Sequence, residues 1–148
     1  MSSLGKVRLA VGAGAVVAAA AGLAVIGQPA VAAPLTSAVS VTPSAGLADG
    51  QSVNVAVSGF KAGVKVRVGM CAEVSPDVLA CDHADGKTVV ADASGAGATP
   101  LTVHKSFQGY RFDGTLYGTV NCTDNCLVGA TDDSQTGAAT AYQPVSFA

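Results

Sequence analysis

The sequence has few charged residues and no excess of basic ones. Of its 148 residues 12% are charged, and the formal net charge is −2. A protein that binds nucleic acid by itself usually carries a basic patch or stripe. A disordered chain combines high charge with low hydrophobicity, whereas this chain is 49% hydrophobic. The composition therefore argues against both classes, and the length suits one domain with an appendage.

Large side chains are also scarce. The chain has no tryptophan, and aromatic residues make up 5% of it. Beyond residue 32 there is no isoleucine and a single methionine, Met70. A core of this composition is filled mainly by valine, alanine and other small residues, which suits thin sheets and can leave a cleft unfilled.

The sequence also lacks the motifs of an active site. Catalysis by a nucleophile or by paired carboxylates needs an organised set of residues, and no G-x-S-x-G or comparable motif is present. Asp132 and Asp133 are adjacent, so in a strand they point to opposite faces. His83 and His104 have no second His or Cys at metal-ligand spacing, so we interpret them as surface polar residues. We expect neither an enzyme nor a metal site.

The N-terminal segment has the layout of an export signal. Lys6 and Arg8 give it a positive start, residues 9–26 carry no charge, and the segment ends in Ala30-Val31-Ala32. This order of a basic start, an apolar run and a small-residue site is typical of a secretory signal peptide. The sequence therefore predicts a signal peptide at residues 1–32.

A membrane anchor is the alternative, because the apolar run approaches the length that spans a bilayer. Its small residues, the helix-breaking Pro29 and the lack of a following positive cluster favour cleavage instead. Residues 33–148 then form one secreted domain, with no membrane contact after cleavage. Without Lys6 and Arg8 this domain has six basic residues against ten acidic ones, a net charge of −4.

The rest of the chain reads as all-β. In residues 64–68 the valines alternate with Lys65 and Arg67, so the two sets lie on opposite faces of a strand. Similar short apolar runs recur between Gly-containing turns at residues 39–41, 53–57, 88–91, 101–107, 116–120, 127–130 and 142–147. About seven short strands in a domain of this size predict a two-sheet, antiparallel sandwich of the immunoglobulin-like type.

One basic cluster interrupts this acidic domain. It consists of Lys61, Lys65 and Arg67, and we interpret it as a solvated sheet edge guarded by charge. Direct binding to duplex DNA would require several phosphate contacts from a domain of net negative charge. Any association with DNA is therefore expected only indirectly, through a bound ligand.

The four cysteines are interpreted as disulfides, because an exported protein meets an oxidising environment. Their spacing allows three connectivities. The simplest is local, with Cys71 joined to Cys81 and Cys122 to Cys126, so that each bridge staples a loop. A zinc site is the alternative, but both spacings are longer than C-x-x-C.

One long stretch, residues 106–122, closely resembles the neocarzinostatin family of enediyne chromoproteins. It reads SFQGYRFDGTLYGTVNC, and shorter matching motifs occur in the same order at VTPS (41–44), GLADG (46–50), GMCA (69–72), VLAC (78–81), DASG (92–95) and VSF (145–147). The resemblance covers essentially all of residues 33–148, and it is collinear.

The resemblance implies a monomeric, secreted apoprotein with a sandwich and a small two-ribbon subdomain. A cleft between them would hold an aromatic or polyene enediyne-type chromophore without a covalent bond and with no other cofactor. The released chromophore would damage DNA, which makes the protein antibacterial and cytotoxic. The family's disulfides pair locally. By matching motifs, the residues implied to line the cleft are Gly69, Cys71, Leu79, Cys81, Phe112, Gly129 and Thr131.

Three positions depart from the family pattern. Glu73 stands where neocarzinostatin has Trp, Gly86 where it has Phe, and Leu127 where it has Gln. Two stacking rings are therefore missing. Either the ligand is a different molecule, or the chain is an envelope or interaction module of the same family that has lost ligand binding.

Overall fold

The computed structural model describes residues 36–133 and 140–148, so the predicted signal peptide at residues 1–32 lies outside the described residues. Within them every regular element is a strand, and no helix of the length and apolarity needed to cross a membrane occurs in these ranges. The strands are β1 (Ala38–Thr42), β2 (Gln51–Ser58), β3 (Lys65–Ser75), β4 (Val78–Asp82), β5 (Lys87–Val90), β6 (Gly97–Val103), β7 (Ser106–Tyr110), β8 (Leu116–Asn121), β9 (Cys126–Asp132) and β10 (Thr140–Pro144).

The smaller sheet has three antiparallel strands in the order β1-β2-β6. Its central strand, β2, alternates as the sequence predicts. Val53, Val55 and Val57 are buried, whereas Ser52 and Asn54 are exposed. Because alternate side chains point to opposite faces, one face of this sheet is apolar and packs into the core.

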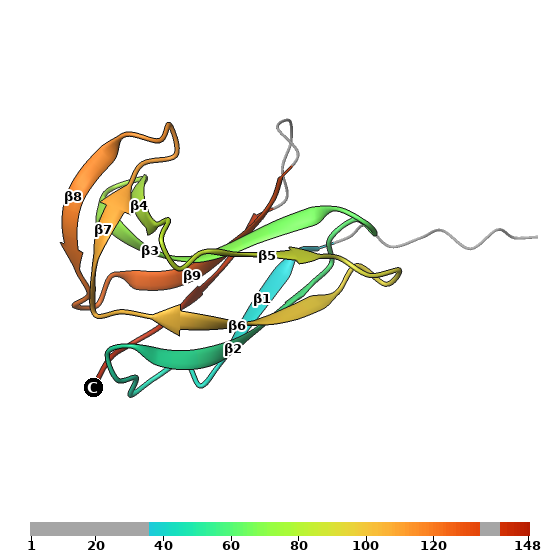
Figure 1. The fold of residues 1–148 in the computed structure, drawn as a ribbon, viewed down its shortest axis with the longest axis horizontal. Coiled ribbons are helices and arrows are strands. Elements are labelled where there is room, and N and C mark those ends of the chain that lie inside the picture. The colour runs from blue at the N-terminus through green and yellow to red at the C-terminus, as the bar shows by residue number, and fades with distance from the viewer. Residues whose placement is uncertain (1–35, 134–139) are drawn as a thin grey trace, which may run out of the picture. The chain divides into compact units, whose positions relative to one another are not determined.

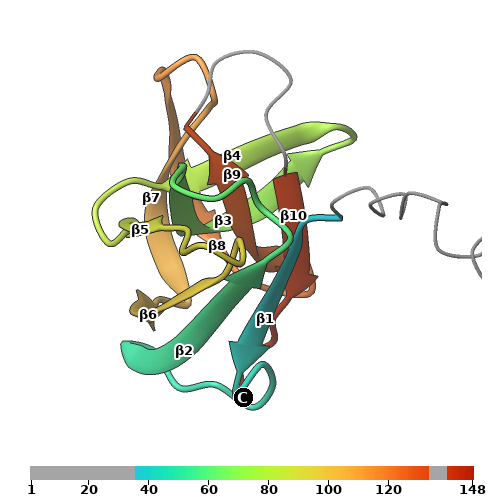
Figure 2. The same cartoon turned by 90° about the vertical axis from the view of Figure 1, so that its right-hand side faces the viewer.

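The larger sheet has seven strands, in the order β10-β9-β3-β4-β7-β8, with β5 paired to β3. Its buried valines, among them Val66, Val68 and Val128, share one core with those of the smaller sheet. Phe60, which follows β2, is 1% exposed and is one of the largest fully buried side chains. Figure 1 shows β7 and β8 rising beside β4, away from β1, β2 and β6, and Figure 2 shows the same arrangement from the side.

The all-β, two-sheet fold is as predicted, but the strands differ in two places. The segment between Cys71 and Cys81 was expected to be a loop stapled by a disulfide, and it instead belongs to the hairpin of β3 and β4. Cys71 and Cys81 lie directly opposite each other in this hairpin and form a disulfide. Cys122 and Cys126 form the second disulfide. The hairpin escapes the alternation rule because Met70, Cys71 and Ala72 are all buried.

The second difference is that the run at residues 101–107 is not one strand. It breaks at His104 and Lys105, where the chain leaves the smaller sheet through β6 and enters the larger one through β7. The Lys105 N–H donates to Asp49 Oδ1 at 2.8 Å instead of to a neighbouring strand. The chain can change sheets here because a side chain satisfies the backbone group that the ladder leaves unpaired.

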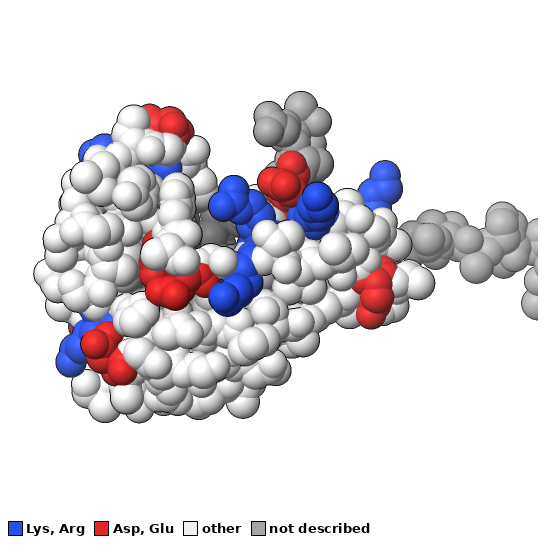
Figure 3. All heavy atoms as spheres, in the orientation of Figure 1, with Lys and Arg blue, Asp and Glu red and all other residues white. Residues whose placement is uncertain are grey.

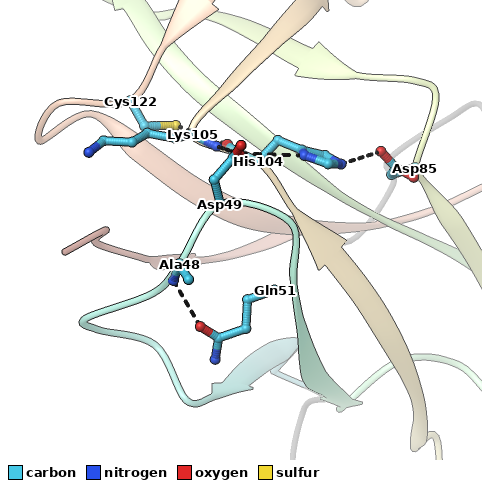
Figure 4. A network of polar contacts seen from close by, with 7 residues as sticks. All are labelled: Ala48, Asp49, Gln51, Asp85, His104, Lys105 and Cys122. Carbon is cyan, nitrogen blue, oxygen red and sulfur yellow. Dashed lines mark hydrogen bonds and ion pairs between the residues drawn. The ribbon is translucent and has the colours of Figure 1, made fainter.

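His104 is less exposed than the sequence suggested. Its side chain is 32% exposed and lies between two carboxylates, with Nε2 3.0 Å from Asp85 Oδ2 and Nδ1 3.5 Å from Asp49 Oδ1. Figure 4 shows the ring reaching from the β6–β7 crossing toward Asp85 in the β4–β5 loop. The expectation was wrong because it assumed one continuous strand with a solvated face.

The basic residues of β3 are not at a sheet edge, so that interpretation was also wrong. Arg67 is paired with Thr131 of β9 on one side and with Thr88 of β5 on the other. Lys65 is paired with Val90 of β5, and its carbonyl oxygen accepts a hydrogen bond from the Asp133 N–H just beyond β9. Alternation reveals which face a residue occupies, but it carries no information about which strands lie on either side.

The C-terminal residues close the fold against the loop before β2. Leu47 N–H donates to Ser146 O at 3.0 Å, and Ala148 N–H donates to Leu47 O at 2.9 Å. Leu47 and Phe147 form a parallel bridge, and Leu47 is 1% exposed. β10, just before this seam, is the end strand of the larger sheet.

Candidate ligand cleft

A cavity of about 530 Å³ lies over the part of the larger sheet where β9, β3 and β5 meet the β4–β7 ribbon. This volume falls in the range typical of sites for small organic ligands. The lining residues come from six strands and the three connections β4–β5, β7–β8 and β9–β10: Arg67, Val68, Gly69, Cys71, Cys81, Asp82, His83, Gly86, Lys87, Thr88, Tyr110, Phe112, Gly129, Thr131, Asp132, Asp133 and Tyr142.

Two glycines make the floor of the cavity. Gly69 on β3 pairs directly with Gly129 on β9, and Tyr142 on β10 is the next partner in the same row. A Cβ on Gly129 would come within 3.3 Å of the Tyr142 ring. Without side chains on these two residues, a flat ligand can approach the backbone closely beside an aromatic ring.

Six of the seven residues implied by the resemblance line this one cavity: Gly69, Cys71, Cys81, Phe112, Gly129 and Thr131. The Cys71–Cys81 disulfide joins β3 to β4, and both of its cysteines line the cavity. Leu79 lies two residues before Cys81, opposite Glu73, and is not one of the lining residues. The structure thus brings the implied set together apart from Leu79.

Phe112 is presented by the tip of the β7–β8 hairpin. Its side chain is 74% exposed, which is unusual for so large an apolar group. The turn beneath it is closed by Asp113, whose Oδ1 accepts hydrogen bonds from Thr115 Oγ1 at 2.6 Å and from the Thr115 N–H at 2.9 Å. The Arg111 guanidinium lies 5.2 Å from the centre of the Tyr117 ring. Local polar contacts therefore hold an exposed phenyl ring at the cavity's edge.

These contacts predict how the turn responds to acid. The Thr115 hydroxyl and N–H, and then Arg111, hold the pKa of Asp113 below its ordinary value of 3.8. The folded-state pKa is the lower one, so the contribution to stability is present above pH 3.8 and is lost as the pH falls through the folded-state pKa. Replacing Thr115 by valine should raise the Asp113 pKa toward 3.8, as measured by NMR titration of the carboxyl carbon.

Asp92 is the matched control for this titration. Its pKa is also lowered, chiefly by the Ser94 hydroxyl, in a turn remote from Thr115. The Thr115→Val variant should leave the Asp92 titration unchanged. An unchanged Asp113 titration in the variant would contradict the assignment of its low pKa to Thr115.

A stacked pair of rings forms another part of the wall. The rings of His83 and Tyr110 are nearly parallel, at 12°, with their centres 4.7 Å apart. Asp82, which precedes His83 in the chain, is 6% exposed and accepts a hydrogen bond from the Ala84 N–H at 2.8 Å. All three also border a second hollow of about 710 Å³ on the side of His104 and Phe107. The β4–β5 loop therefore separates two hollows.

The three departures from the family pattern fall in different places. Gly86 lines the cavity, where it offers backbone and no ring. Glu73 is exposed, and its N–H donates to Asn125 O at 3.0 Å. Glu73 and Leu127 are absent from the described lining. Of the three, the position at Gly86 affects the space available to a ligand most directly.

Sequence reasoning missed several lining residues, above all Arg67, Tyr110 and Tyr142. Tyr142 is 49% exposed. A half-exposed tyrosine on a strand is common, so nothing in the sequence marks it as part of a binding site. Tyr110 belongs to the quoted motif at residues 106–122, so it could have been considered. Arg67 was assigned to a sheet edge, which concealed its place beside the cavity.

The sequence pattern of the neocarzinostatin family matches residues 39–147. Macromomycin of Streptomyces macromomyceticus is 44% identical over 112 residues, 74% of this chain and 76% of that protein. The antitumor antibiotic C-1027 apoprotein of Streptomyces globisporus is 44% identical over 119 residues, 79% of this chain and 80% of that protein.

Comparison with solved structures leads to the same group. The macromomycin structure superimposes with a TM-score of 0.69 at 42% sequence identity, covering 76% of this chain and all of the other. The fold described above therefore occurs in a related protein of established structure. The chain belongs to the neocarzinostatin family.

Proposed function

We propose that this protein is a secreted apoprotein that binds, stabilises and carries a labile enediyne-type chromophore. One observation carries the proposal: a cavity of about 530 Å³ with a glycine floor and aromatic walls lies in a chain 44% identical to an antitumor antibiotic apoprotein. Burial in such a cavity shields a reactive ligand from water and thiols.

The protein acts in this proposal as a binding module, not as an enzyme. The ligand is held without a covalent bond, as a monomeric complex. Antibacterial and cytotoxic action, and damage to DNA, belong to the chromophore after its release. The domain's acidic charge is consistent with this division, because direct binding to phosphates would require basic contacts.

The test is to purify the secreted protein from its native host. Three tyrosines and no tryptophan leave the polypeptide without absorbance in the visible range, so any colour reports a bound molecule. The proposal expects an absorbing compound that copurifies with the protein and is extracted by organic solvent. A colourless preparation with no extractable compound would overturn it.

Phe112→Ala should weaken retention of the extracted compound about three- to tenfold, because a stacked aromatic contact contributes about 0.5–1.5 kcal/mol. Dissociation of the compound, followed by its absorbance, gives the measurement. Leu116→Ala is the matched control, since Leu116 is 56% exposed on the same hairpin but is not among the residues described as lining the cavity. Equal retention by both variants would remove Phe112 from the site.

A structural or interaction module is the second candidate, and Gly86 favours it. At this lining position the chain has no ring with which to stack on a ligand. In that case the native protein would carry no compound, and added aromatic ligands would not bind in the cavity.

A further inference from the structure

Arg67 occupies a defined place beside the glycine floor. It is two residues before Gly69 on β3, so its side chain starts on the same face of the sheet. Its direct partners across the two neighbouring strands are Thr131 on β9 and Thr88 on β5. All four of these residues line the cavity, and Arg67 is exposed to solvent within it.

Arg67 has no carboxylate partner in the described part of the chain. The ion pairs found there both involve His104. Of the acidic residues lining the cavity, Asp82 accepts from the Ala84 N–H, and Asp132 has a partner of its own. Asp133 lies one row further out, where its N–H donates to Lys65 O at 2.8 Å. Among the described residues the guanidinium therefore forms no ion pair, and its cross-strand neighbours are two threonines.

Protection of a sheet edge does not explain this charge, because β3 is paired on both sides. Figure 3 shows several Lys and Arg side chains next to the hollow between the β4–β7–β8 part and the rest of the larger sheet, with acidic side chains also at its rim. A guanidinium offers five N–H donors in a plane, which fit the two oxygens of a carboxylate. Threonine hydroxyls on either side can donate to the same acceptor.

We propose that Arg67 determines ligand specificity by binding an acidic group, and that the ligand of this cavity is a flat aromatic or polyene molecule bearing a carboxylate. Its apolar body lies along Gly69 and Gly129 against Tyr142, and its carboxylate accepts hydrogen bonds from the Arg67 guanidinium between Thr88 and Thr131. This inference rests on the proposed function, because it names the chemical class of ligand for the same cleft.

Two probes of the same shape test this. Anthracene-2-carboxylate carries the charge, and anthracene-2-carboxamide is its neutral counterpart. The full domain should bind the carboxylate about tenfold more tightly than the amide, a modest value because Arg67 is exposed. Fluorescence titration gives both dissociation constants, and shifts of the Gly69 and Gly129 amide NMR signals show that binding is in the cavity.

Arg67→Gln should weaken binding of the carboxylate far more than binding of the amide, so that the preference for the carboxylate is lost. Arg67→Lys should keep part of the preference, because the charge remains but the planar pair of donors is lost. Lys65→Gln is the control, since Lys65 is on the same face of the same strand, two residues away and opposite Asp133. It should retain the preference in full.

The outcomes separate this inference from the proposed function. If both probes bind equally to the unaltered protein, or if Arg67→Gln keeps the preference, the role of Arg67 is wrong and the cleft stands as a neutral site. If neither probe shifts the floor glycines and the native protein carries no compound, the carrier function fails, and this inference fails with it.

Discussion

The substitution Gly69→Phe should weaken ligand binding by roughly a hundredfold while leaving the fold intact. Gly69 is at the centre of the cavity floor, and its side-chain direction leads into the cavity. A Cβ there meets only Asp82 O at 3.6 Å and Gly86 Cα at 4.0 Å, which are ordinary contacts. The strand therefore accepts a Cβ at this position without a backbone shift, and we expect the ring of the variant to take the ligand's place.

The size of the loss follows from the contact that is removed. Occluding roughly 120 Å² of apolar ligand surface at about 25 cal/mol/Å² costs about 3 kcal/mol, which is a factor of roughly a hundred in the dissociation constant. Titration with anthracene-2-carboxamide measures it without any contribution from Arg67. Gly69→Ala is the graded control and should lose far less, because one methyl group leaves most of the cavity open.

Thermal unfolding of the Gly69→Phe variant must be followed alongside the titration. A glycine in the interior of a strand weakens it, so the midpoint should not fall. Full affinity for the amide in a folded variant would show that ligands bind elsewhere, for example in the larger hollow beside His104.

The largest loss of stability is expected from Phe60→Ala. Phe60 is 1% exposed between the two sheets, in a core otherwise filled mainly by valine and alanine. Small neighbours cannot close over the space that a lost ring leaves, so the free energy of unfolding should fall by about 3–5 kcal/mol. Domains of this kind have about 5–15 kcal/mol in total, and chemical denaturation would show the change as a lower midpoint.

Phe112→Ala is the matched control, because the same substitution is made at a ring that is 74% exposed. It should change the free energy of unfolding by less than about 0.5 kcal/mol, although it weakens ligand binding. The two phenylalanines thus separate stability from function. Similar destabilisation by both substitutions would mean that Phe112 is part of the core.

Much of the fold is predictable from local sequence patterns, because the alternating valines of β2 and β3 indicate which face of each strand is buried. The break in the run at residues 101–107 is less visible. Leu101, Val103 and Phe107 are all buried, and the alternation passes straight through Lys105. Lys105 is nevertheless an exposed charge at a position that a single strand would bury, and that inconsistency was the available signal.

The site was predictable only in part, and for a physical reason. Gly69, Gly129 and the bonded cysteines belong to motifs that the resemblance covers, so they could be placed together. Arg67 could not be placed in the site, because its role depends on its neighbours Thr88 and Thr131. Those neighbours come from strands 21 and 64 residues further along the chain, and their register is set by packing that a local pattern does not contain.

The C-terminal seam couples the closure of the fold to the shape of the cavity. Tyr142, one wall of the cavity, is near the end of the chain, and the strand that carries it is followed directly by the contacts of Ser146 and Ala148 with Leu47. A substitution that opens these contacts would free the strand that positions Tyr142, so the closure of the fold and the position of this wall are linked.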